Sequence, residues 1–399
     1  MAVIQLPPTV LRLGHPIPVA LRDASGRLLV PRGTLLADEE QRQQLIARGV
    51  YVDTNDSEHF KKALAGKLDA MVRSNALLGQ IASAVPDAAD CAPAAGVRAG
   101  SDPVAAWNGL LSRASALLHE PPQEDFAGRV QRLDRELLGL LDADADVSLL
   151  VLIQSATGMP HQYSVTHALL VAAVCELAAR HLAWPAPWRP SLRCAALTMN
   201  LAMTALQDEL ALQDGPVTPR QRAVIDAHAQ RAMQQMSALG VDDPLWLQAV
   251  EHHHASPPGP LAELAPELQL ARLVQRADIF AARLSPRRVR QALSATAAAK
   301  AAYFDEHQQA DEAGAAIIKA CGIYPPGSYV RLASGEVGVV VRRGRRANEP
   351  VVAGIVSKVG TPLVEPALRD IRRPAFAITG AVAPHDVKLR LNLASLLRL

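Results

Sequence analysis

Apolar residues recur every three or four positions from about residue 107 to residue 323, which predicts a mainly helical domain over this stretch. One of its helices carries Tyr163 and His167 one turn apart and continues through further apolar positions. Another begins at the capping signal Thr218-Pro219 and places His228 in line with its apolar face. Polar groups therefore point inward from several helices.

Two more helices of this domain carry residues of chemical interest. An apolar stripe that includes Met199 and Met203 predicts one continuous helix from Ser191 to Leu210. The segment ARLVQRADIFAARL predicts another helix, whose apolar stripe brings Asp278 close to the core. A buried carboxylate requires a polar partner.

The two flanking regions show a different pattern. Two short apolar runs around Ser25-Gly26 predict a hairpin, and a short helix is expected from a cap at Asp38 to Gly49. A helix from about Ser57 to Ala82 then leads into a linker rich in Ala, Pro and Gly. After residue 323 the alternation in YVRLASGEVGVVV predicts a second hairpin, to which VVAGIVSKV adds a third strand.

These patterns predict a mainly α fold in four stretches. They are an α+β module over 1–56, a helix and linker over 57–105, a helical domain over 106–323, and a β-containing unit over 324–399. With 41 basic and 39 acidic residues in 399, the net charge of +2 argues against a nucleic-acid or membrane partner. The N-terminus lacks a signal-peptide pattern, no long uncharged apolar run is present, and the protein is expected to be cytoplasmic. Reduced, mostly buried thiols are expected at Cys91, Cys175, Cys194 and Cys321.

The stretch VEHHHASPPGP contains three consecutive histidines and indicates metal chemistry. A site for divalent metals in a helical bundle takes imidazoles and carboxylates from different helices, and two close metals need a bridging carboxylate. The candidates in this chain are His228, His252, His253, His254 and Asp278.

The order and spacing of these segments resemble the HD-GYP domain, a bacterial branch of the HD phosphohydrolase superfamily. YSVTHALLVAAVCELA resembles its opening helix, AALTMNLAM its His-Asp helix, and PVTPRQRAVIDAHAQRAMQQM the segment of the next histidine. EHHHASPPGP resembles the His-His-Glu and Gly-Tyr-Pro loop, and LARLVQRADIFAARLSPRRVR the helix of the last aspartate. The resemblance implies an HD-type helical bundle, and its active members hydrolyse cyclic di-GMP at a two- or three-metal site.

Several positions depart from the family pattern. Tyr163 stands where the resemblance expects the opening histidine, and Met199 and Asn200 stand where it expects the His-Asp pair. A thioether is a poor ligand for iron, manganese or magnesium, and a neutral amide cannot bridge two cations. Met203 replaces a lysine that often contacts phosphate, and His254 replaces a glutamate.

The ligand positions that remain in this resemblance are His228, His252, His253 and Asp278, and Arg287 matches an arginine expected to bind phosphate. Each has a simpler interpretation. His228 is then a core histidine bonded to Asp278, and His254 faces solvent. Tyr163 is expected to fill the cavity of the former metal site and to form a hydrogen bond to a histidine or to Asp278.

Three functional hypotheses follow. The first is a catalytically impaired HD-GYP-like signalling protein that acts by binding a protein partner or a nucleotide. The second is a metal-dependent phosphohydrolase with residual cyclic di-GMP phosphodiesterase activity. The third is a sensor in which arginines hold a nucleotide phosphate without cleaving it, with a solvated basic helix face as the alternative for Arg283, Arg287, Arg288 and Arg290.

No cofactor is expected under the first hypothesis, although two or three histidines with Asp278 suffice for a single iron, manganese or other divalent metal. The basic run RRGRR, Arg342 to Arg346, is expected in a loop of the β unit. It is interpreted as a solvated turn, with contact to an acidic partner as the alternative.

Overall fold

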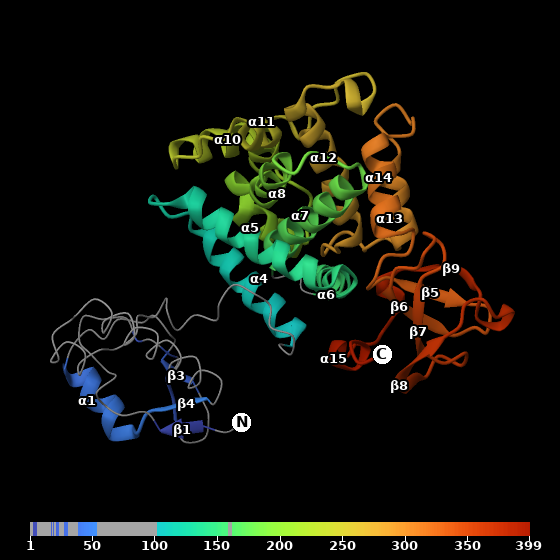
Figure 1. Cartoon of the computed structure of the whole chain (residues 1–399), viewed down its shortest axis with the longest axis horizontal. Helices are drawn as coiled ribbons and strands as arrows, with labels where there is room; N and C mark the ends of the chain where they lie inside the picture. The colour runs from blue at the N-terminus through green and yellow to red at the C-terminus, as the bar shows by residue number, and fades with distance from the viewer. Residues whose placement is uncertain are drawn as a thin grey trace, which may run out of the picture. The chain divides into compact units, whose positions relative to one another are not determined.

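The computed structural model describes residues 3–5, 17, 19, 21–23, 28–30, 39–53, 102–158 and 162–399 (Figure 1). The chain divides into two compact units, Met1–Gly96 and Val97–Leu399. The predicted helix from Ser57, most of the linker, the Ser25-Gly26 turn and Cys91 lie outside the described residues. The predicted boundaries of the four stretches stay predictions.

The first unit contains a small antiparallel sheet in the order β1-β4-β2-β3. Its elements are β1 (Val3–Gln5), β2 (Leu21–Arg22), β3 (Leu28–Val30), α1 (Glu39–Arg48) and β4 (Tyr51–Asp53). The antiparallel pairing of β2 with β3, in which Leu21 lies opposite Val30, agrees with the predicted hairpin. The helix ends before Gly49, whose φ of +73° favours glycine. The core of this unit consists of Ile17, Val19, Leu21, Val30, Leu45, Val50 and Val52.

The second unit begins with a helical bundle. Its α-helices are α4 (Pro103–His119), α5 (Phe126–Ala143), α6 (Ala145–Gly158), α7 (Tyr163–His181), α8 (Trp188–Thr198), α9 (Thr204–Leu212), α10 (Pro219–Ala238), α11 (Pro244–His252), α12 (Pro266–Leu284), α13 (Ala295–Tyr303) and α14 (Glu312–Cys321). Short 3₁₀ turns form at η3 (Leu201–Met203) and η4 (Leu261–Glu263). At the start of α10, Thr218 and Gln221 form the reciprocal side-chain cap that the sequence predicts in part.

Helix α7 is the centre of this bundle (Figure 1). Every residue from Tyr163 to Ala179 is buried, because α6, α8, α12 and α14 all pack against it. Such a helix is apolar on all sides, so its few polar side chains need partners inside the protein.

One of these polar side chains is the fully buried Glu176. Arg193 donates to Glu176 at 2.6 Å and also to both carboxylate oxygens of Asp134, at 2.5 and 2.8 Å. Arg180 and Arg189 donate to the other oxygen of Glu176 at 2.6 and 3.0 Å. The network joins α5, α7 and α8 and leaves neither carboxylate unpaired.

The predicted single helix from Ser191 to Leu210 is wrong. Helix α8 ends at Thr198, and α9 begins only at Thr204. Asn200 lies between them with φ −105° and ψ 14°, outside the helical region. Two short helices that share one buried face give the same apolar spacing as one long helix, so the stripe could not reveal the break.

The chain then forms a five-stranded antiparallel sheet in the order β8-β7-β6-β5-β9. Its strands are β5 (Tyr329–Leu332), β6 (Val337–Arg342), β7 (Val351–Val356), β8 (Pro362–Arg369) and β9 (Ile378–Val382). A 3₁₀ turn, η5 (Pro374–Phe376), lies between β8 and β9. A second 3₁₀ turn, η6 (Pro384–Asp386), and a short helix, α15 (Leu393–Leu396), follow β9. The predicted hairpin and its third strand are confirmed as β5, β6 and β7.

The predicted fold class is confirmed, since the described residues are mainly helical with a small sheet in each unit. Within these residues no helix combines the length and the apolar character that crossing a membrane requires. Cys175, Cys194 and Cys321 are buried free thiols, as expected.

The Glu176 network predicts a large stability effect. Glu176→Ala leaves the buried Arg193 partly unpaired, and removal of one partner from a buried pair costs about 3–5 kcal/mol. The change is measured by urea unfolding followed by tryptophan fluorescence, because all four tryptophans lie in the second unit. Glu136→Ala removes an acid paired with Arg113 at the surface, and this control is expected to cost at most about 1 kcal/mol. An equal loss in the free energy of unfolding of the two variants would contradict the assigned role of Glu176.

Candidate metal centre

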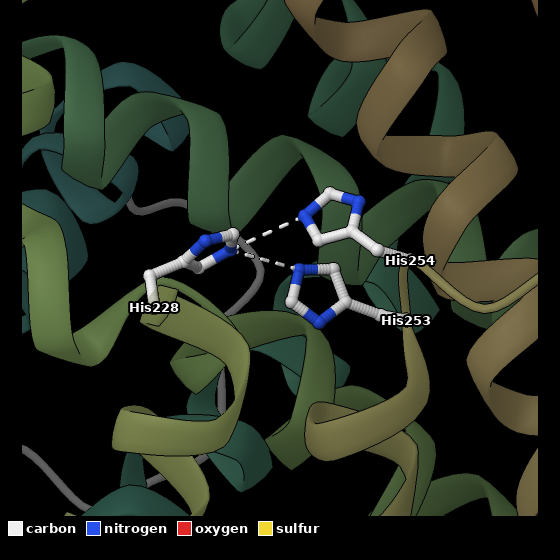
Figure 2. A group of neighbouring side chains, drawn as sticks. All are labelled: His228, His253 and His254. Atoms are coloured by element: carbon white, nitrogen blue, oxygen red, sulfur yellow. Dashed lines mark hydrogen bonds between the residues drawn. The ribbon is translucent and has the colours of Figure 1, made fainter. Parts of the chain in front are cut away.

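Three histidine side chains converge at one point of the helical bundle (Figure 2). His228 comes from α10, while His253 and His254 follow the last residue of α11. The Nε2 atom of His228 lies 3.2 Å from Nε2 of His253 and 3.3 Å from Nε2 of His254. His228 and His253 are buried, and His254 is exposed at the edge of the group.

The end of α11 brings two consecutive imidazoles together. Neighbouring residues within a helix point about 100° apart, but α11 stops at His252 and the chain turns, with the Ala255 amide donating to the His252 carbonyl at 2.7 Å. The rings of His253 and His254 therefore lie with centroids 4.1 Å apart. His252, which the sequence analysis placed among the ligands, instead lies beside Glu251, 4.0 Å from its carboxylate.

The hydrogen bonds of His228 and His253 fix which ring nitrogen is free. Nδ1 of His228 lies 2.5 Å from the Ile225 carbonyl, and Nδ1 of His253 lies 2.6 Å from the Val250 carbonyl. A carbonyl only accepts, so each Nδ1 carries the proton and each neutral ring presents a lone pair at Nε2. Burial lowers the pKa of His253 to about 3, with the neighbouring His254 acting in the same direction, and burial also lowers the pKa of His228.

Two lone pairs that face each other at 3.2 Å repel unless a cation lies near both. Nitrogen ligands at opposite ends of a tetrahedral edge around zinc are about 3.3 Å apart, given the usual zinc–nitrogen bond length. The two nitrogen pairs at 3.2 and 3.3 Å match this spacing. The donor set therefore fits one divalent metal of the kind that imidazole prefers, such as zinc or iron.

A second polar pair accompanies the three histidines. Nε2 of the buried His167, on α7, lies 2.7 Å from Oδ1 of the half-buried Asp278, on α12. Burial would raise the pKa of Asp278, but the hydrogen bond from His167 and the proximity of the His167, His253 and His254 imidazoles lower it to about 2. Asp278 is therefore an anion near the cluster. The predicted bond between His228 and Asp278 is wrong, because His167 takes that place.

Tyr163 lies one turn before His167 and stacks on it, with ring centroids 5.6 Å apart and planes 8° from parallel. Its hydroxyl accepts from the Arg287 guanidinium at 3.2 Å, and the same guanidinium lies over the tyrosine ring at 4.8 Å. The predicted bond from Tyr163 to a histidine or to Asp278 is wrong. Tyr163 instead holds Arg287 close to the His167–Asp278 pair.

The remaining predicted positions differ in their surroundings. Met199 is a buried core residue, and Asn200 is half-buried at the break between α8 and α9. Arg288 pairs with Asp214 at the surface, whereas Arg290 donates to the Ala282 carbonyl at 2.6 Å. Backbone hydrogen bonds of 2.8 Å pair Arg287 with Arg290, and Arg283 also lies near Arg290, so Arg288 is the member of the four that pairs elsewhere.

Two residues that the structure brings into the site are not among the ligand positions that the resemblance retains. His254 is exposed, as expected, and is also a member of the cluster. His167 was treated as part of an apolar helix, although its spacing of four from Tyr163 was noted. The signal for His254 was the third histidine of the run, and the signal for His167 was a histidine one turn after Tyr163 on a helix with inward-facing polar groups.

Comparisons with known proteins give one curated relative and one solved structure. No protein-family model matches the chain. The chain is 29% identical over 211 residues to the cyclic di-GMP phosphodiesterase PA4108 of Pseudomonas aeruginosa, a match that covers 50% of this chain and 49% of the relative. The similarity thus spans about half the length of the curated relative.

A solved structure, Bd1817, a HDG"Y"P protein from Bdellovibrio bacteriovorus, covers 79% of this chain and 97% of its own at a TM-score of 0.42 and 14% identity. The resemblance to HD-GYP proteins that the sequence indicates is confirmed, and the divergence of the metal site stays a prediction.

The cluster geometry predicts which histidines hold a metal. Protein purified from cells grown with iron, manganese and zinc is expected to carry about one equivalent of metal by elemental analysis. His253→Ala is expected to reduce that content at least tenfold, because it removes one of three nitrogens. His252→Ala is the matched control, since it removes the neighbouring imidazole outside the cluster and is expected to leave the metal content unchanged. If His252→Ala loses the metal and His253→Ala retains it, the assignment is wrong.

Proposed function

We propose that this chain is a catalytically impaired HD-GYP-like signalling protein that binds cyclic di-GMP at the metal centre of its helical bundle. The single observation that carries the proposal is the convergence of three imidazole Nε2 atoms, all within 4.8 Å of one another, without a carboxylate among them. This arrangement suits one cation better than a bridged pair of cations.

The ligand class rests on the relative, whose name states a cyclic di-GMP phosphodiesterase. Cyclic di-GMP carries two phosphodiester groups, each with one negative charge. A metal on His228, His253 and His254 would supply a Lewis acid for one phosphate oxygen. Arg287, held by Tyr163, supplies a planar guanidinium that pairs with phosphate oxygens.

Impaired hydrolysis follows from the residues at the break between α8 and α9. Asn200 has a neutral amide where two close metals would need a bridging anion, and Met199 is buried in the core. Asp278 is anionic, but its Oδ1 is engaged by His167. Metal activation of water supplies several kcal/mol of barrier reduction in such reactions, so loss of the second metal costs several orders of magnitude in rate.

The second candidate, a phosphohydrolase with residual activity, is favoured by His167. The sequence suggested that the opening helix has lost its histidine, but His167 projects from that helix and contacts Asp278 at 2.7 Å. His167 and Asp278 with the three clustered histidines give five donor groups in one region of the bundle. The protein partner that the sequence analysis proposed stays a prediction.

Calorimetric titration tests the proposed ligand. The metal-loaded chain is expected to bind cyclic di-GMP, and Arg287→Ala is expected to weaken binding about 10- to 100-fold, the range of a hydrogen bond to a charged group. Arg288→Ala is the control, because Arg288 lies next to Arg287 in sequence but pairs with Asp214 at the surface. The nucleotide proposal is wrong if the unmodified chain does not bind cyclic di-GMP, or if both variants lose the same amount of affinity for it.

A hydrolysis assay separates the two candidates. The impaired protein is expected to show turnover at least a thousandfold below that of the PA4108 phosphodiesterase assayed beside it, and the double change Met199→His with Asn200→Asp is expected to raise that turnover. Turnover of the unmodified chain comparable to that of the relative would select the phosphohydrolase instead. His252→Ala again serves as the control that leaves the rate unchanged.

A further inference from the structure

A second charged site lies away from the metal centre, between the end of α14 and the loop that joins β6 to β7. It is a pocket of about 370 Å³, within the size range of pockets that bind small molecules. Lys319, Arg343, Arg345 and Arg346 line it, and Asp146 is its one acidic residue. The loop contains the basic run RRGRR, which the metal centre does not use.

The four cations differ in how far they are already neutralised. Arg343 donates to Asp146 at 2.5 Å and to the Ala320 carbonyl at 2.8 Å, so it is a structural residue. Arg346 contacts Glu349 at 3.3 Å while remaining largely exposed. Within the described residues, Lys319 and Arg345 have neither an ion pair nor a hydrogen bond. The pocket therefore presents two free cations and no free carboxylate of its own.

The backbone holds this loop in place. Gly344 approaches the Glu349 carbonyl so closely that a Cβ would lie 1.7 Å from that oxygen, so the turn requires glycine. The Ile323 amide donates to the Ala347 carbonyl at 3.2 Å, which fastens the loop to the segment after α14. Arg343 makes a second connection through Ala320. Because the walls are fixed, binding a ligand costs little ordering of the chain.

We infer that this pocket binds a phosphate-bearing anion through Lys319 and Arg345. Guanidinium and ammonium groups are the side chains that recognise phosphate, and a fixed concave wall raises their effect over that of scattered surface charges. The phosphate can belong to a soluble molecule or to a lipid headgroup, since both present the same group. The inference does not depend on the proposed function, because no residue is shared with the metal centre.

Titration of the full chain with inorganic pyrophosphate tests the site. Saturable binding is expected, and the double variant Lys319→Glu with Arg345→Glu is expected to weaken it at least tenfold. The double variant Arg372→Glu with Arg373→Glu makes the same change of charge at exposed arginines near Asp370, and it is expected to change the affinity less than twofold. Circular dichroism checks that both variants are folded.

Co-sedimentation with phosphatidylglycerol vesicles distinguishes the source of the phosphate. Pyrophosphate binding lost only in the pocket variant assigns a soluble ligand. Vesicle binding lost only in that variant, without pyrophosphate binding, assigns a lipid headgroup. Failure of both probes to bind, or equal weakening by the two double variants, overturns the inference. Arg287→Ala is expected to leave pyrophosphate binding unchanged, so failure here is distinct from failure of the cyclic di-GMP proposal.

Discussion

The burial of α7 from Tyr163 to Ala179 is the constraint on which the helical bundle depends. A helix with no solvent-facing side satisfies its backbone internally, but each polar side chain on it must find a partner in a neighbouring helix. Glu176 near its end binds Arg193 on α8, and His167 near its start binds Asp278 on α12. These two contacts fix the direction and rotation of α7, because apolar packing alone permits small rotations at little cost.

The same constraint positions the candidate site. Rotation of α7 by one residue would take His167 away from Asp278 and Tyr163 away from Arg287. The ion-pair network of Glu176 and the group around Asp278 thus contact opposite ends of the same helix, α7.

The sequence could predict the elements of the fold because apolar period and capping residues are local properties. The reciprocal cap at Thr218 and the β5–β6 hairpin needed only neighbouring residues. The break after Thr198 and the partner of Asp278 could not be predicted, since both depend on which faces meet in space. The exchange of His252 for His254 has the same origin: the run of three histidines does not state where α11 ends, and that point alone decides which rings turn inward.

The chemistry of the site follows from how its charges are distributed. Burial opposes protonation of His228 and His253, and the nearby anion Asp278 is engaged by His167. A single divalent cation satisfies the facing lone pairs, and Asn200, which stands where the resemblance expects the bridging aspartate, offers a neutral amide in place of an anion. A cation in such a site keeps much of its positive charge, because few anions offset it. Such a cation attracts a phosphodiester anion, but it also activates a bound water, as zinc on three histidines does. The proposed loss of hydrolysis therefore depends on the missing second cation and not on the charge of the first.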